Sequence, residues 1–93
     1  MRTIYRYKLG LDDFSSINLP VGAEVLSISN ERVNTHIEIE MWAAVDTNRP
    51  LVTRQFAVVG TGHAMPEGSA KFIGTVMVDN GEYVFHVFEV GNL

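Results

Sequence analysis

Apolar and polar side chains alternate at every second position through most of this chain. In the clearest segment the apolar members are Ile37, Ile39, Met41 and Ala43, and the residues between them are His36, Glu38, Glu40 and Trp42. A period of two places the two sets on opposite faces of a β-strand. No segment sustains an apolar stripe at the helical spacing of about 3.6 residues. We therefore expect a β protein with less than about 15% helix.

The same alternation and the turn-forming residues between the segments predict six or seven strands. They are expected at residues 3–7, 16–19, 25–29, 37–45, 52–59, 72–79 and 82–90. Asn80-Gly81 favours a type I′ turn and hence a C-terminal β-hairpin. Asp46–Pro50 is expected to be a hairpin-type loop, and Ala64–Ala70 is expected to be the longest loop, with room for one helical turn. The fold class is thus all-β: one domain over residues 1–93, a small antiparallel sandwich or barrel-like sheet.

Two arrangements remain open for the Ile37–Val45 strand. Trp42 continues the face of Glu38 and Glu40, and a tryptophan on that face suggests a partner-binding patch of Trp42, Glu38 and Glu40. Alternatively, a bulge near Ala43-Ala44 switches the strand's faces and places Trp42 in the core. The paired carboxylates are themselves either an acid–base pair or ordinary solvated charges.

Composition excludes several classes of protein. Seven basic residues against eleven acidic ones give a net charge of −4, so we expect no binding to duplex nucleic acid. No run of about 18 apolar residues is present, so we expect no membrane span. The chain has no cysteine, and its first residues lack the apolar core of a signal peptide. These features together favour the cytoplasm, with a basic partner as one possibility.

Gly60-Thr61-Gly62-His63 is the segment that most suggests a ligand site. Two glycines allow close backbone approach, and consecutive amides can hold an anion. Thr61 adds a hydroxyl and His63 a titratable ring, while Arg54 would supply a fixed charge if its strand face opens onto the same end. A small anionic or nucleotide ligand would suit this set. The alternative is that the segment only ends a strand and turns the chain.

Other reactive constellations are missing from the sequence. The three histidines, His36, His63 and His86, lack the spacing of a metal site, so we expect no metal and no cofactor. No Gly-x-Ser-x-Gly elbow and no cysteine nucleophile occur. His86 shares a largely apolar strand face and is expected to be a packed or interface histidine. We therefore expect a protein that is not an enzyme.

Aromatic residues exceed what a chain of 93 residues can bury. The residues in question are Tyr5, Tyr7, Trp42, Phe85 and Phe88. Because closed two-fold pairing is the commonest solution for a small chain, we expect a homo-oligomer, most simply a dimer.

Several motifs carry a resemblance that covers almost the whole chain. They are Ile4-Tyr5-Arg6-Tyr7, Met41-Trp42-Ala43, Gly60-Thr61-Gly62-His63, Phe72-Ile73-Gly74-Thr75 and Phe85-His86-Val87-Phe88-Glu89. The chain resembles a family of small uncharacterised proteins encoded mostly by bacteriophages and prophages. That resemblance implies an origin and a size class but no reaction. For a small acidic protein of phage origin we expect action in the host cytoplasm by binding, so that the protein inhibits or sequesters a host factor, such as a defence complex or a nucleotide signal. A structural or assembly component of the particle is the first alternative, and a small nucleotide-processing enzyme is the second.

Overall fold

The computed structural model describes residues 1–11, 14–30, 38–78 and 81–91, and seven strands lie within them. They are β1 (Arg2–Gly10), β2 (Phe14–Pro20), β3 (Glu24–Ser29), β4 (Glu38–Asp46), β5 (Leu51–Gly60), β6 (Ala70–Val78) and β7 (Tyr83–Val90). Over these ranges no residue is helical, which confirms the expected all-β class. The described part of the chain likewise contains no helix long and apolar enough to cross a membrane.

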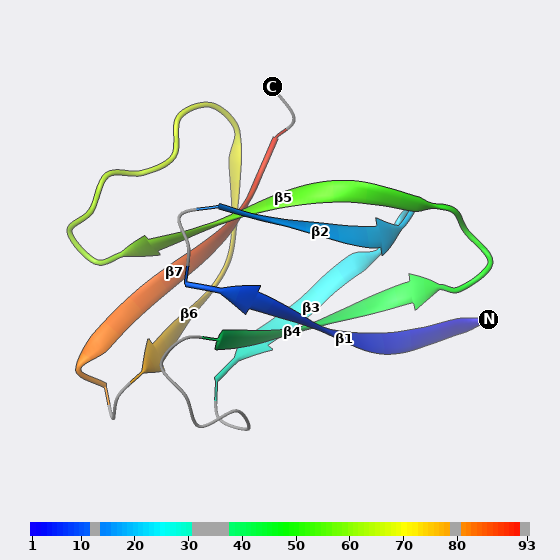
Figure 1. Cartoon of the computed structure of the whole chain (residues 1–93), viewed down its shortest axis with the longest axis horizontal. Coiled ribbons are helices and arrows are strands. Elements are labelled where there is room, and N and C mark those ends of the chain that lie inside the picture. The colour runs from blue at the N-terminus through cyan, green and yellow to red at the C-terminus, as the bar shows by residue number, and fades with distance from the viewer. Residues whose placement is uncertain (12–13, 31–37, 79–80, 92–93) are drawn as a thin grey trace.

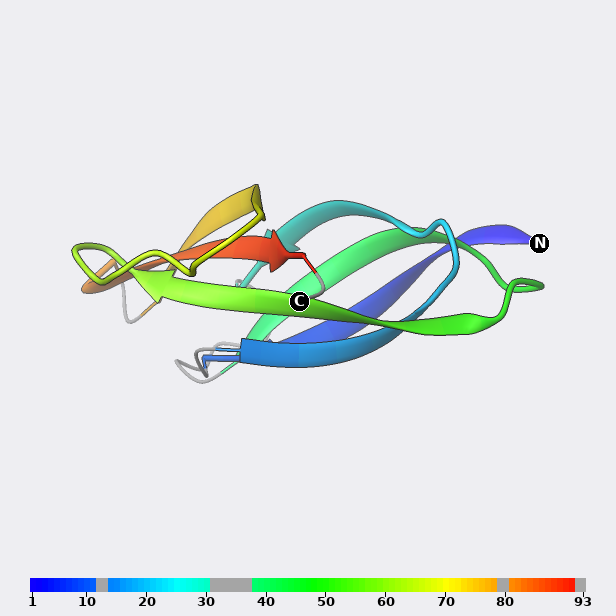
Figure 2. The same cartoon turned by 90° about the horizontal axis from the view of Figure 1, so that it is seen from above.

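The strands form two antiparallel sheets (Figure 1). Sheet A has the order β1-β4-β3, and sheet B has the order β2-β5-β7-β6. Seen from above, β2 lies on one side of the molecule and β3 on the other (Figure 2). The sheets approach one another where β3 meets β6: a Cβ added to Gly74 would lie 3.0 Å from Cγ1 of Ile28. The architecture is therefore the expected small antiparallel sandwich.

The alternating pattern decides which side chains enter the core. On β4, Ile39, Met41, Ala43 and Val45 face sheet B, and all four are buried. Sheet B supplies residues from each of its four strands. Those of the core cluster are Leu19, Phe56, Val58, Val76 and Val87. Because the core is built from one face of each sheet, the other face of each is left to solvent or to a partner.

Trp42 stays on the outer face of sheet A. The pairing of β4 with β1 is unbroken from Glu38 to Asp46, so the alternative of a face switch near Ala43-Ala44 is wrong. The bulge lies instead on the neighbouring strand β3, between Val25 and Ser27. Leu26 is the extra residue there, and it is exposed. His36 and Ile37, which the alternating pattern placed just before Glu38, lie outside the described residues.

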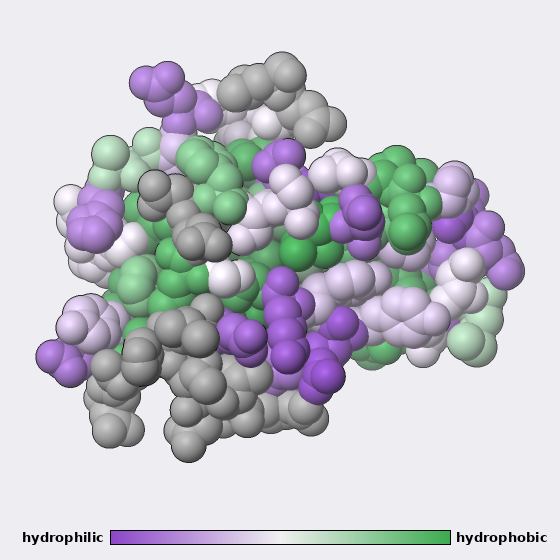
Figure 3. Space-filling view, in the orientation of Figure 1, coloured by the Kyte–Doolittle hydropathy of each residue, from purple (hydrophilic) through white to green (hydrophobic). Residues whose placement is uncertain are grey.

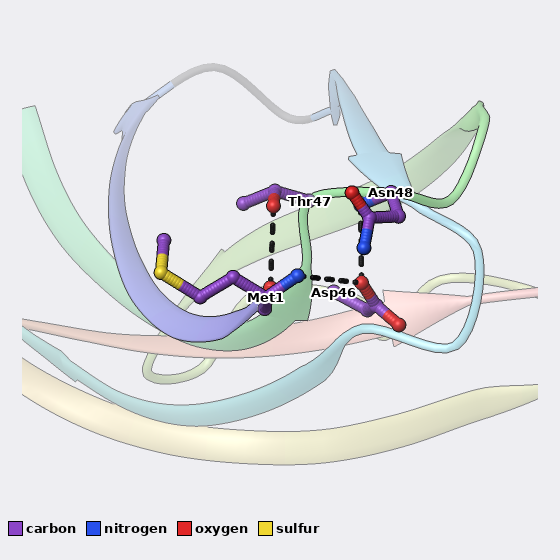
Figure 4. A network of polar contacts seen from close by, with 4 residues as sticks. All are labelled: Met1, Asp46, Thr47 and Asn48. Carbon is purple, nitrogen blue, oxygen red and sulfur yellow. Dashed lines mark hydrogen bonds and ion pairs between the residues drawn. The ribbon is translucent and has the colours of Figure 1, made fainter.

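The loop after β4 joins the two sheets and is not the hairpin loop that its composition suggested. β4 belongs to sheet A and β5 to sheet B, so the chain crosses between layers at this point. Asp46 organises the crossing (Figure 4): its carboxylate accepts hydrogen bonds from the N–H of Asn48 at 3.0 Å and from the N-terminal ammonium at 3.5 Å. The N–H of Thr47 donates a hydrogen bond to the Met1 carbonyl at 2.9 Å.

Two further connections can be compared with the sequence. The C-terminal hairpin of β6 and β7 is confirmed, with Gly81 at a φ of 87° and its N–H bonded to Val78 at 3.1 Å. Asn80, on which the type of that turn was argued, lies outside the described residues. The segment from Ala64 to Ser69 contains no helical turn, contrary to expectation. Pro66 removes a backbone donor and Gly68 takes a φ of 83°, so a helix cannot form there.

Candidate functional site

Gly60-Thr61-Gly62-His63 forms a turn at the end of β5. The His63 N–H donates to the Gly60 carbonyl at 3.0 Å, and Gly62 has a φ of 88°, as the third residue of a type II turn requires. The Thr61 N–H donates to the Val84 carbonyl of β7 at 3.2 Å. Two of the backbone amides that the sequence suggested as anion ligands therefore already donate hydrogen bonds within the fold.

The Thr61 hydroxyl is also engaged, by the side chain of His86. Its Oγ1 lies 2.8 Å from Nε2 of His86, and Oγ1 of Thr75 lies 3.0 Å from Nδ1 of the same ring. A neutral imidazole has one donor and one acceptor nitrogen, so one threonine accepts a hydrogen bond and the other donates one. His86 is thus the satisfied histidine that its position on an apolar strand face suggested.

His63 folds back over the glycine that begins the turn. A Cβ added to Gly60 would lie 3.0 Å from Nδ1 of His63, so the ring occupies the space that any larger residue at position 60 would need. From this place His63 lines a cavity of about 400 Å³ between residues 63–67, β5 and the start of β2. The described residues that line it are Phe14, Ala57, Val58, Val59, His63, Ala64, Met65, Pro66 and Glu67. We call it the loop cavity.

The loop cavity is large enough for a side chain or a small ligand, because ligand sites start at about 300 Å³. Seven of its nine described lining residues are apolar, and Figure 3 shows hydrophobic residues beside hydrophilic ones around the loop at the left. Glu67 contributes one carboxylate, and the described residues of the lining include neither arginine nor lysine. An apolar group therefore fits this lining better than an anion does.

Arg54 does not reach the turn. It lies six residues before Gly60 on β5, which corresponds to roughly 20 Å along a strand. Its guanidinium forms a two-fold contact with the carboxylate of Glu89, at 2.6 Å and 2.7 Å, and donates to the Ala23 carbonyl at 2.6 Å. The hydrogen bond to Glu89 raises the pKa of Arg54 above its ordinary value. The structure thus uses this charge inside the fold.

The second predicted set, Trp42, Glu38 and Glu40, does share one face of β4, but its carboxylates are engaged. Oε2 of Glu40 lies 3.2 Å from Nη1 of Arg6, and Oε2 of Glu38 lies 3.8 Å from Nζ of Lys8. Glu40 is completely buried and Trp42 is half-buried. These cross-strand pairs neutralise the acidic half of the proposed patch. In Figure 3 hydrophilic residues gather over β1, the strand that supplies both cations.

The sequence reasoning missed the outer face of sheet B. Strand register places one row of side chains across its four strands, from Phe14 through Ala57 and Phe88 to Phe72. The rings of Phe88 and Phe72 meet edge to face, with centroids 5.5 Å apart. The remaining residues placed on this face by the register are Ser16, Asn18, Pro20, Leu51, Thr53, Gln55, Val59, Ala70, Thr75, Met77, Val84, His86 and Val90. We call this surface the aromatic face.

Among the described residues, the aromatic face has no aspartate, glutamate, lysine or arginine. The outer face of sheet A has all four types. Its charged residues are Arg2, Arg6, Lys8, Glu24, Glu38, Glu40 and Asp46. The two outer surfaces of the sandwich therefore differ in kind: one is charged, as is usual for a solvated sheet, and the other is apolar. The loop cavity opens on the apolar one, since Phe14, Ala57 and Val59 belong to both.

No cluster of three or more histidine, aspartate or glutamate side chains suited to a metal ion occurs in the part of the chain that the structure describes. No curated protein and no solved structure matches the chain. A family model does match, a domain of unknown function called DUF7352, over residues 1–92. Since the match covers nearly every residue, the chain belongs to the DUF7352 family.

Proposed function

We propose that this chain is a non-catalytic binding protein that inhibits or sequesters a host protein. The phage or prophage origin, and with it the host cytoplasm as the place of action, follow from the sequence resemblance. The observation that carries the proposal is the loop cavity: it has a volume of about 400 Å³, seven of its nine described lining residues are apolar, and it opens on a sheet face whose described residues carry no charge. Such a cavity suits an apolar side chain that a partner protein presents.

The lining supports this kind of anchor. Phe14 and Met65 are both exposed at its rim, and the floor is Ala57, which is only 2% exposed. Burying one large apolar side chain in such a site contributes roughly 1.5–3 kcal/mol. The methionine has three rotatable bonds and a polarizable sulfur, so it can adjust to the shape of what enters. One anchor of this kind, surrounded by neutral contacts, is a common arrangement in protein interfaces.

A protein partner is favoured over the anionic or nucleotide ligand that the sequence also suggested. A phosphate needs fixed positive charge or free amides. The cation that the sequence suggested, Arg54, is bonded to Glu89, and the amides of Thr61 and His63 donate within the fold. Glu67 in the lining would repel an anion. These contacts leave a neutral, apolar group as the best occupant.

The test is capture of partners from the host that produces the protein, with variants of the cavity. Phe14→Ala and Met65→Ala should each remove a partner that the wild type retains, as judged by quantitative mass spectrometry of the captured proteins. Ile4→Ala is the matched control, because Ile4 is as exposed as Phe14, at 58%, but lies on the outer face of sheet A. Capture is run at nanomolar concentration.

Two results would contradict the proposal. One is a profile of captured proteins that is the same in both cavity variants as in the wild type. The other is native mass spectrometry of freshly purified protein that shows a retained nucleotide or other small anion. That second result would favour the other possibility from the sequence analysis, in which the protein sequesters a small signal molecule.

A further inference from the structure

The aromatic face exposes more apolar surface than a solvated sheet needs. Phe14 and Phe72, at the two ends of its central row, are 58% and 56% exposed, and Met77 is 62% exposed. A contiguous apolar patch of several hundred Å² on a soluble protein usually marks an interaction site. Aromatic residues and methionine are also the types enriched in the centres of interfaces.

Four polar residues of this face, Asn18, Thr53, Thr75 and His86, form hydrogen bonds within the chain. Thr53 donates to Oδ1 of Asn18 at 2.7 Å across β5 and β2. Thr61 and Thr75 hold both ring nitrogens of His86. A covered polar group is costly only when its hydrogen bonds are lost. Since these bonds are made within the chain, the face can be covered without leaving them unsatisfied.

The distribution of charge indicates what kind of surface covers the face. The chain carries a net charge of −4, yet the described residues of the aromatic face contribute none of it. Such a face offers no attraction to a charged surface. Two copies placed face to face would bury no charge, and their acidic residues would remain on the outside. The face is thus electrostatically suited to itself.

The size of the face is sufficient for a modest interface. Four strands at about 4.8 Å spacing and seven or eight residues at about 3.3 Å each give roughly 500 Å² on one copy. Two copies would then bury roughly 1,000 Å², which is at the lower limit for a specific association. Such an interface predicts a dimer with a dissociation constant in the micromolar range, rather than a permanent one.

We propose that a second copy of this chain covers the aromatic face in the absence of another partner. The central row combines small and large side chains: Ala57 stands between Phe14 and Phe88, and the exposed Phe72 stands at the end of the row. In a two-fold arrangement each copy presents both features to the other. Because the loop cavity opens on the same face, the second copy and the partner proposed above exclude each other.

The experiment is sedimentation equilibrium of the full chain over a concentration series reaching tens of micromolar and above. The wild type should approach twice the 10.3 kDa of one chain. Phe72→Asp should remain monomeric, because it would bury an unpaired charge within the interface. Ile4→Asp is the matched control: Ile4 is equally exposed, but on the charged face of sheet A, so this variant should still dimerise.

Circular dichroism of each variant shows whether it folds, and Met77→Asp repeats the test at a second exposed position. Raising the salt concentration should leave the dimer unchanged or strengthen it slightly, because no interfacial ion pair is broken and repulsion between acidic copies is screened. A monomeric wild type at every concentration overturns the proposal. So does a folded Phe72→Asp that still dimerises, or an Ile4→Asp that does not.

The dimer and the proposed function fail separately. Phe72 and Met77 do not line the loop cavity, whereas Phe14 and Met65 do. A wild-type monomer that captures a host protein through Phe14 refutes the dimer alone. A dimer whose captured proteins do not depend on the cavity refutes the proposed function alone.

Discussion

Arg54 and Glu89 form an ion pair on the inner side of sheet B, where β5 and β7 run side by side. Nε and Nη2 of the arginine contact Oε2 and Oε1 of the glutamate at 2.6 Å and 2.7 Å. Nη1 reaches the carbonyl of Ala23, at 2.6 Å, just before β3 of sheet A. The pair therefore ties the two sheets together near one end of the sandwich.

Removing one member of this pair should destabilise the fold. Arg54→Met would leave a half-buried carboxylate without its partner, and hydrogen bonds to charged groups contribute about 1.5–3 kcal/mol each to stability. We expect urea unfolding to show a loss of about that size. Lys71→Met, at an exposed cation, should change the free energy of unfolding by less than about 0.5 kcal/mol. Equal losses in the two variants would contradict the proposed tie.

Asp46 gives the stability a dependence on acid pH. The N–H of Asn48, followed by the N-terminal ammonium, lowers the pKa of this carboxyl below its ordinary 3.8. A lowered folded-state pKa means that the charged form stabilises the fold above about pH 4, and that this contribution is lost as the pH falls through the folded value.

Asp46→Asn tests this dependence. The asparagine oxygen can still accept the hydrogen bond from residue 48, but it carries no charge. The thermal midpoint of the variant should lie below that of the wild type at neutral pH, and the difference should shrink as the pH falls below 4. A carboxyl titration of Asp46, followed by NMR, should have its midpoint below 3.8. A midpoint at or above that value would refute the assignment.

Strand positions could be predicted because alternation is a local property. Ile39, Met41, Ala43 and Val45 face the core as their period of two requires. The aromatic face could not be predicted in the same way. A charged residue in a strand normally marks the solvent side, so Arg54 and Glu89 made the inner face of sheet B look like the outer one. Arg54 and Glu89 can lie on the inner face because they bond to each other, and they are 35 positions apart in the sequence.

The candidate site was predicted only in part, for a related reason. Gly60 and Gly62 correctly indicated a strand end and a turn, and His63 does line a cavity. The cavity's other walls come from β2 and from the loop residues after the turn, which no local pattern relates to one another. The partner of Thr61 was equally hidden, because His86 lies 25 residues away on β7.

The hydrogen bond between Thr61 and His86 changes what is expected of Thr61→Val. From the sequence alone this variant should alter stability by less than about 1 kcal/mol. With Oγ1 held 2.8 Å from Nε2 of His86, we instead expect a loss of about 1 kcal/mol, or roughly 4–8 °C in the thermal midpoint of a domain of this size.

Thr75→Val should lower the midpoint by a similar amount, since Thr75 bonds the other nitrogen of the same ring. The double variant should differ from the sum of the two, because they share His86. Ser16→Ala, at an exposed position on β2, serves as the control and should leave the midpoint unchanged. A Thr61→Val protein as stable as this control would show that the turn does not depend on the histidine.

Gly74 and Ile28 define how closely the two sheets approach at the β3–β6 edge. A Cβ at position 74 would lie 3.0 Å from Cγ1 and 3.2 Å from Cδ1 of Ile28, which is tighter than an ordinary contact, so the Ile28 side chain would have to move by a few tenths of an ångström. Gly74→Ala should therefore destabilise the fold by about 1–3 kcal/mol through overpacking.

Truncating Ile28 removes both of the atoms concerned, so the cost of Gly74→Ala should fall by roughly 1 kcal/mol in an Ile28→Ala background. Leu26→Ala, at the exposed bulge of the same strand, should give no such relief. Denaturant unfolding of the four combinations measures the coupling, and additive losses for Gly74→Ala and Ile28→Ala would mean that the sheets separate freely at this edge.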